Sequence, residues 1–314
     1  MERAAQEPRE QQEPRRTGVS RRALLFGGAT VVAAATVGTA GLLGLREPRA
    51  PAGELSAVFV DGPLPVTDPT HDVWGEARHV EIALQPQQMA PPWLGEATLD
   101  RLAVRALYNG TDLGLLLEWD DPEVDRHEGI ATFRDAVAAM LPTALGGEEP
   151  PPIFMGWEGQ PVYLAHWKAS WQLDLDERYQ DVGDIYPGWF NDVHPGHDTL
   201  TDLGLDAEAA SVYAPGRHVG NPLSQRDRPA PVEELSAEGF GTLTHLPEQH
   251  ASGRGVHDGR MWHVTLGIPG GRNAPELPAG RTVPISFAVW HGSEGQVGAR
   301  KQYADWTELT LPEA

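Results

Sequence analysis

The sequence of 314 residues contains no cysteine. It therefore excludes disulfides, thiolate zinc sites, iron–sulfur clusters, a cysteine nucleophile and the covalent attachment of a c-type haem. Basic residues are also few, since 24 Lys and Arg face 45 Asp and Glu, and the formal net charge is −21. This balance argues against a nucleic-acid partner, which needs clustered basic side chains to neutralise phosphates.

Lysine is the rarest charged residue, because only Lys168 and Lys301 accompany 22 arginines. Arginine keeps its proton in proteins, whereas lysine can lose it and then act as a base, a nucleophile or a metal ligand. Both lysines lie in aromatic sequences that are typical of strands. Either they serve a special purpose or they are remnants in an arginine-rich chain, and the counts alone leave both interpretations open.

Residues 1–22 are polar and end in Ser20-Arg21-Arg22, and an uncharged run follows from Ala23 to Leu45. Twin arginines before a moderately apolar, Gly- and Ala-rich run predict a twin-arginine export signal over residues 1–52. The alternative is a membrane anchor through residues 23–45, which are long enough to span a bilayer. Export by this route carries folded proteins to a periplasmic or other extracytoplasmic compartment, often with a cofactor in place.

Short apolar or alternating runs recur after residue 53, each bounded by Gly, Pro, Asn or Asp, as strands are. They cover Val80–Leu84, Leu102–Tyr108, Leu113–Trp119, Val162–Trp171, Met261–Gly267 and Val283–Trp290. The Asn109–Asp112 sequence predicts a hairpin turn, and Thr132–Met140 predicts a short helix. The fold class predicted for residues 53–314 is all-β, an antiparallel β-sandwich with long loops and a few short helices, including a loop-rich insertion at about 176–256.

Familiar catalytic motifs are missing from the chain, which has no G-x-S-x-G elbow and no phosphate-binding glycine loop before a helix. Paired carboxylates such as Asp120-Asp121 indicate a solvated acidic surface. The densest histidine cluster, His194 and His197, indicates either a metal site or a polar loop. Methionine is sparse, and Met155 lies in an apolar stretch, where core filling is the ordinary interpretation.

Ordered motifs lie along the chain at Asp135–Ala138, Met155–Ala169, Gly220–Ser224, Gly239–Thr244, Phe287–Gly295, Gly298–Lys301 and Trp306. Together these motifs resemble those of the ethylbenzene-dehydrogenase-related haem b proteins, the γ subunits of periplasmic molybdenum enzymes of the dimethyl sulfoxide reductase family. The resemblance spans residues 57–312 approximately.

The resemblance implies a β-sandwich that holds one haem b non-covalently between a methionine and a lysine. The family's ligating lysine corresponds to Lys301, and its methionine corresponds to Met155, with Met140 as the competitor. One departure is His291, which stands where the family usually has Asp; it is either near a propionate or a replacement for Lys301 as ligand. Lys168 is implied to be a structural or propionate-pairing cation.

The function implied is electron transfer rather than catalysis. The chain would relay single electrons between an iron–sulfur subunit and an external carrier such as a c-type cytochrome. The iron–sulfur subunit would in turn belong to a complex with a molybdopterin catalytic subunit. Two other interpretations stay open. One is a carbohydrate-binding β-sandwich without haem, in which some of the ten tryptophans stack on sugars. The other is a stand-alone haem carrier or sensor.

Overall fold

The computed structural model describes residues 54–147, 149–180, 215–225, 228–271 and 274–313. The Ala23–Leu45 segment, His194 and His197 lie outside the described residues. Ala50–Ala314 form one unit of the chain, and everything described below belongs to it. Within the described ranges, no helix combines the length and the apolar character needed to cross a membrane.

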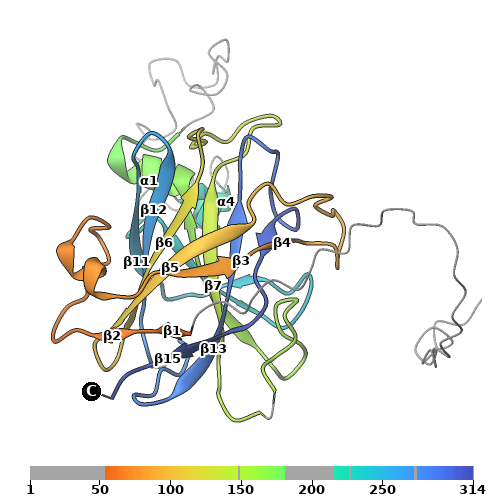
Figure 1. The fold of residues 1–314 in the computed structure, drawn as a ribbon. Coiled ribbons are helices and arrows are strands. Elements are labelled where there is room, and N and C mark those ends of the chain that lie inside the picture. The colour runs from red at the N-terminus through yellow and green to blue at the C-terminus, as the bar shows by residue number, and fades with distance from the viewer. Residues whose placement is uncertain (1–53, 148, 181–214, 226–227, 272–273, 314) are drawn as a thin grey trace, which may run out of the picture. The chain divides into compact units, whose positions relative to one another are not determined.

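Two β-sheets, built mostly from antiparallel strands, make up the described part of the chain (Figure 1). The larger sheet has the order β1 (Leu55–Ser56), β15 (Thr307–Thr310), β13 (Thr282–Trp290), β7 (Ala136–Pro142), β8 (Val162–Lys168), β9 (Val232–Ala237) and β10 (Thr244–His245), and β14 (Gln302–Tyr303) pairs with both β13 and β4 (Gln85–Pro86). The smaller sheet has the order β11 (Ser252–His257), β12 (Met261–Ile268), β6 (Leu113–Asp120), β5 (Arg101–Tyr108) and β2 (Val58–Phe59), and β3 (Val80–Ala83) also pairs with β5.

The core lies between the two sheets, because successive side chains of each strand point alternately into it and away from it. In β7, Val137, Ala139 and Leu141 face this core and are 1% exposed or less. Trp119, Trp167 and Trp262 meet at its centre, with ring centroids 5.0 to 6.4 Å apart. Because inward-facing residues of both sheets share one apolar layer, the fold is a β-sandwich, and the predicted all-β class is confirmed.

Helices are short and peripheral within the described residues. They comprise α1 (Ala169–Asp176), α4 (Pro215–His218) and the 3-10 turns η2 (Asp72–Glu76) and η4 (Pro222–Ser224). The predicted hairpin turn is confirmed: β5 and β6 pair directly around Asn109–Asp112, and the Asn109 carboxamide accepts the Asp112 N–H at 2.7 Å.

Two local predictions are wrong. The helix expected at Thr132–Met140 is instead strand β7, because its alternating side chains fit between β13 and β8 and this pairing outweighs the helix propensity of alanine. The strand expected to reach Trp171 ends at Lys168 and gives way to α1.

The loop-rich region expected at about 176–256 lies partly outside the described residues. Its described part contains β9, β10 and most of β11, whose Gly-rich or charged sequences carry a weak strand signal.

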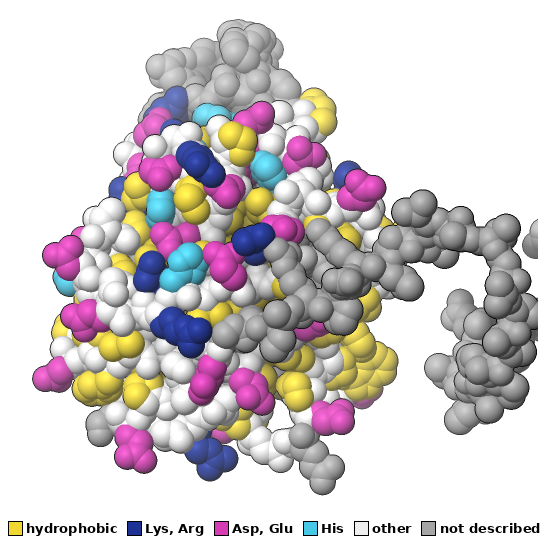
Figure 2. Space-filling view, in the orientation of Figure 1, with side chains coloured by type: hydrophobic (Ala, Val, Ile, Leu, Met, Phe, Trp, Pro, Cys, Tyr) yellow, Lys and Arg dark blue, Asp and Glu magenta, His cyan; other side chains and the backbone are white. Residues whose placement is uncertain are grey.

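Acidic side chains are spread over the face shown in Figure 2 and alternate with Arg, Lys and His rather than gathering in one patch. The negative charge of this face is therefore distributed, as expected of a solvated acidic surface. The face in that view offers no concentrated acidic area for a basic partner.

Gly255 provides a test of the sandwich core. A methyl group at this position in β11 would overlap the indole ring of Trp167 across the sheet interface. We expect Gly255→Ala to lower the free energy of unfolding by about 1–3 kcal/mol, the usual cost of overpacking. Denaturant titration followed by fluorescence measures this, and Gly75→Ala, whose methyl meets no atom within 4 Å, is the control. Equal stability of the two variants would contradict this packing.

Candidate functional site

A deep cavity of about 890 Å³ opens on the outer face of the larger sheet. Its volume is in the range of pockets that bind cofactors and small ligands. Since successive side chains of a strand point to opposite faces, the residues of β7 that do not face the core point into this cavity. The cross-strand partners then line up, with Ala138 beside His166 and Met140 beside Leu164.

The floor of the cavity is made of small side chains. Ala136 and Ala138 of β7 lie beside Ala288 of β13, and the rings of Trp290 and Tyr303 border them. Three alanines on adjacent strands leave a broad space directly above the sheet. A flat, rigid ligand can therefore approach the backbone closely there.

Lys301 reaches the cavity from the segment between β13 and β14. Its Nζ lies 5.0 Å from the centroid of the Trp290 ring, and within the described part of the chain it has neither an ion pair nor a hydrogen bond. Burial lowers the pKa of Lys301 to about 8, because no carboxylate offsets the loss of hydration. The amine therefore loses its proton more readily near neutral pH than an ordinary lysine does. An amine without its proton has a lone pair that can coordinate a metal.

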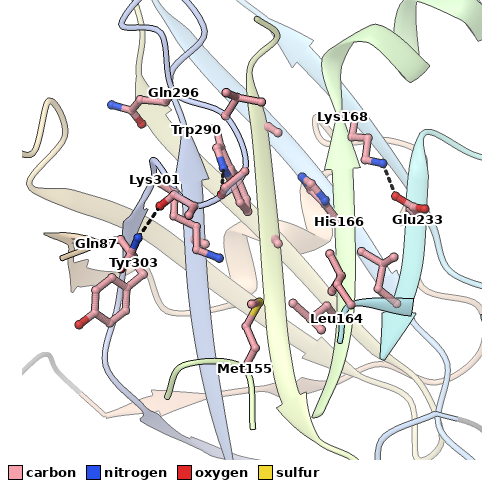
Figure 3. A pocket seen from close by; sticks show the side chains of 18 of the residues that line it. Gln87, Met155, Leu164, His166, Lys168, Glu233, Trp290, Gln296, Lys301 and Tyr303 are labelled. Carbon is pink, nitrogen blue, oxygen red and sulfur yellow. Dashed lines mark hydrogen bonds and ion pairs between the residues drawn. The ribbon is translucent and has the colours of Figure 1, made fainter. Parts of the chain in front are cut away.

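Met155 enters the same cavity from the loop between β7 and β8 (Figure 3). Its backbone is in the left-handed region, at φ 70°, and the Gly239 N–H donates to its carbonyl at 2.7 Å. This tight turn directs the thioether inward, next to Leu164. Met140 also lines the cavity, but it does so from strand β7 at 6% exposure.

One end of the cavity is polar. Lys168 forms a buried ion pair with Glu233, and the His245 Nδ1 lies 2.9 Å from the other oxygen of Glu233. Arg134 forms an ion pair with Glu128, yet its Nε is buried without a partner among the described residues. Burial lowers the pKa of Lys168 to about 8 against the opposing effect of Glu233. The polar end thus contrasts with the apolar end around Met155.

His166 lies between the two ends and was not predicted from the sequence. Its ring stacks on Trp290, with centroids 4.7 Å apart and an interplanar angle of 26°. Burial lowers its pKa well below the ordinary value, and Lys168 and Arg134 lower it further, so the imidazole is neutral. Its Nε2 is buried and has no partner within the described ranges. The sequence signal was its position two residues before Lys168, on the same face of a strand.

His291 does not reach the cavity. Because Trp290 points into it, the next residue points elsewhere, and the His291 Nε2 lies 3.0 Å from an Asp121 oxygen. Its Nδ1 lies 3.4 Å from the Thr98 hydroxyl. The structure therefore brings Met155, Met140, Lys301 and Lys168 to one cavity and leaves His291 out.

The arrangement suits a flat metal-containing ligand with one apolar and one anionic edge. An unpaired amine and a thioether are both transition-metal ligands, and they approach the cavity from different elements. Clusters of three or more His, Asp or Glu that could hold a metal by themselves are absent from the described residues.

Fold and cavity together define a β-sandwich protein with a cofactor-sized cavity on the outer face of one sheet. Residues 71–208 match the family described as ethylbenzene dehydrogenase.

Two relatives extend this finding. A protein described as a respiratory nitrate reductase haem subunit, from Haloferax mediterranei, is 23% identical over 260 residues, which are 82% of this chain and 72% of that protein. The chlorate reductase subunit gamma of Ideonella dechloratans is 35% identical over 79 residues, which are 24% of this chain and 33% of that protein. This second match spans about a third of the relative's length.

Solved structures that resemble the chain include a family 9 carbohydrate-binding module from Caldicellulosiruptor kristjanssonii in complex with cellotriose. It has a TM-score of 0.38 and 9% identity, and the match covers 83% of this chain and 94% of that one. A protein described as carbohydrate-binding, from Bacteroides uniformis, has a TM-score of 0.40 and 7% identity, with 83% and 100% covered.

Proposed function

We propose that the chain binds one haem b non-covalently and serves as the electron-transfer subunit of an exported molybdenum oxidoreductase. One observation carries the proposal: the side chains of Lys301 and Met155 line the same cavity. The Lys301 amine has no hydrogen-bond or ion-pair partner among the described residues and lies beside the Trp290 ring. The match of residues 71–208 to the ethylbenzene dehydrogenase family supports it, as do two relatives named as a haem subunit of a nitrate reductase and a gamma subunit of a chlorate reductase.

Haem held in this way supplies one-electron chemistry, and an iron with two protein ligands has no free position for a substrate. The role of Lys301 and Met155 is therefore to hold the iron rather than to react. A buried amine with a lowered pKa coordinates at little cost of deprotonation. A thioether ligand raises the reduction potential. Both properties fit a relay that accepts and releases single electrons.

The polar end of the cavity suits the propionate edge of the ligand. Lys168 and Arg134 supply cationic groups there, and the Arg134 Nε and, next to this end, the His166 Nε2 have no hydrogen-bond partner among the described residues. The alanine floor suits the flat ring, and the apolar residues around Met155 suit its vinyl and methyl edge. In this assignment Lys168 keeps its ion pair with Glu233, so it is both a structural and a propionate-facing cation.

The partners proposed are an iron–sulfur subunit, a molybdopterin catalytic subunit and a c-type cytochrome as external carrier. Export by the twin-arginine route to a periplasmic or extracytoplasmic location is proposed from residues 1–52, with anchoring through residues 23–45 as the alternative. Co-purification of a tagged chain with a molybdenum-containing subunit tests the complex, whereas a haem-loaded chain without partners would favour a stand-alone carrier.

The carbohydrate-binding alternative gains no support from the described tryptophans. It requires indole rings exposed on a sheet face, but Trp119, Trp167 and Trp262 are at most 2% exposed. Trp93 and Trp157 are exposed, and both lie in loops rather than in the named strands. We therefore favour the haem-binding function.

The choice between the two methionines is testable by reconstitution with haem. We expect Met155→Ala to lose the six-coordinate low-spin absorption spectrum, because Met155 extends into the cavity from a loop and not from a strand of the sheet. Met140→Ala is expected to retain that spectrum, since its side chain belongs to the wall. Absorption spectra of the ferric and ferrous proteins are the measurement, and a loss of low-spin character in Met140→Ala alone would reverse the assignment.

A further inference from the structure

Gln87 follows strand β4 and is only 3% exposed. Every polar group of this residue is hydrogen-bonded. Its backbone N–H donates to the Lys301 carbonyl at 2.9 Å, and its own carbonyl accepts the Leu94 N–H at 2.9 Å. Its side-chain amide donates to the carbonyls of Ala299 and Ala90, both at 2.8 Å. A buried glutamine satisfied in this way is fixed in one orientation.

The Gln87 bonds enclose the position from which Lys301 extends. One reaches the carbonyl two residues before Lys301, and another reaches the carbonyl of Lys301 itself (Figure 3). On the following residue, the fully buried Gln302 carboxamide accepts the Leu99 N–H. The Trp290 indole donates to Gly298 at 3.0 Å. The backbone is thus held on both sides of Lys301, while its amine has no polar partner among the described residues.

This contrast has a physical consequence. A lysine side chain has four rotatable bonds and loses about 2 kcal/mol of conformational free energy when it is fixed. Fixing the backbone beforehand leaves this side-chain cost in place but removes the separate cost of ordering the backbone of the segment when the side chain binds a ligand. Groups that orient a metal ligand in this manner commonly change metal affinity 10- to 100-fold when they are replaced.

We propose that Gln87 is the positioning residue for Lys301, acting through its side-chain hydrogen bond to the Ala299 carbonyl. The proposal rests on the proposed function, because it assumes that Lys301 binds the haem iron. Gln87 bonds to the backbone carbonyls of Ala299 and Lys301. It would act through this backbone and would not itself bind the iron.

Gln87→Glu is the direct test, since glutamate has the same shape but cannot donate to the Ala299 carbonyl. Gln87→Met, which keeps the length without polar groups, is the second variant in case the acid does not fold. Gln88→Glu is the matched control, because the Gln88 amide donates to Gly95 at 3.0 Å and not to the Lys301 segment. Each haem-loaded protein is titrated with imidazole, which displaces whichever of the two proposed ligands, Lys301 or Met155, is held more weakly, and its reduction potential is measured. Of the two ligand segments, the described hydrogen bonds of Gln87 reach only that of Lys301, so tighter imidazole binding in the Gln87 variants than in Gln88→Glu reports a less firmly held Lys301.

We expect imidazole to bind about 10- to 100-fold more tightly to the Gln87 variants than to the wild type, with a shifted reduction potential. Gln88→Glu should match the wild type. Unchanged imidazole affinity and potential in a folded, haem-loaded Gln87 variant would overturn the proposal and leave only a structural role. If the wild type instead binds no haem, or if Lys301→Leu leaves its spectrum unchanged, the proposed function itself fails.

Discussion

Replacing Lys301 with leucine is expected to stabilise the haem-free protein at pH 7 by roughly 1–3 kcal/mol. The reason is that Lys301 is partly buried and has no counter-charge among the described residues, and its pKa falls to about 8 from an ordinary value of about 10.4. Replacing Lys168 with leucine is expected to do the opposite and to cost about 3 kcal/mol or more. That change removes the buried cation that pairs with Glu233 and leaves this carboxylate with the His245 ring as its remaining described partner.

The Lys301 effect has a defined pH dependence. Below pH 8 the lysine is protonated in both the folded and unfolded states, so the folded state bears the full cost of a buried charge. Between pH 8 and about 10.4 the unfolded state binds more protons, and wild-type stability therefore rises with pH. The advantage of Lys301→Leu should accordingly be largest at pH 7 and should decline toward pH 10.

Denaturant unfolding of the haem-free wild type and of both leucine variants, at pH 7 and pH 10, measures these effects. A loss of stability in Lys301→Leu at pH 7 would mean that the amine has a stabilising partner after all. An opposite sign for the two lysines would show that one is kept for structure and the other in spite of its structural cost. Such a cost is expected of a residue retained for function.

Ala138→Leu is expected to weaken haem binding about 10- to 100-fold while leaving the fold intact. The added atoms extend from the cavity floor into the space above the sheet, so they compete with the ligand and not with the core. Overpacking of about 1–3 kcal/mol corresponds to that range, since 1.4 kcal/mol is tenfold in affinity.

Haem titration followed by absorbance measures the Ala138 effect, and thermal unfolding of the haem-free variant checks the fold. Ala83→Leu, on the exposed side of β3 in the other sheet, is the control and should bind haem as the wild type does. Wild-type haem affinity in Ala138→Leu would place the ligand away from this floor.

The fold class was predictable because short apolar or alternating runs recur along the chain and end at Gly, Pro, Asn or Asp. Strand β7 was not, since Ala136–Pro142 is entirely buried, with a core on one side and the cavity floor on the other. Its alanines look helical in isolation, and only their neighbours on β13 and β8 make them a strand. A strand that is buried on both faces is apolar at every position, so its sequence lacks the alternation of apolar and polar residues that indicates a strand.

The site was predictable in part. Resemblance and the scarcity of lysine singled out Met155, Lys301 and Lys168, and the structure brings all three to one cavity. Sequence alone could not separate His291 from the ligands, because its removal from the cavity depends on strand alternation after Trp290 and on the buried Asp121. Gln87 and His166 were missed since their importance arises from contacts across the fold: Gln87 bonds to a carbonyl 212 residues away.

The most direct test of the account is lysine NMR of the reduced, haem-loaded protein. The chain has only two lysines, so protein grown with lysine labelled at the ε-carbon gives two signals. We predict that one ε-methylene signal moves strongly upfield through the ring current of the haem and disappears in Lys301→Arg, whereas the Lys168 signal stays near its ordinary position. If a low-spin spectrum forms while both lysine signals keep ordinary shifts, Lys301 is not an iron ligand and the central claim is contradicted.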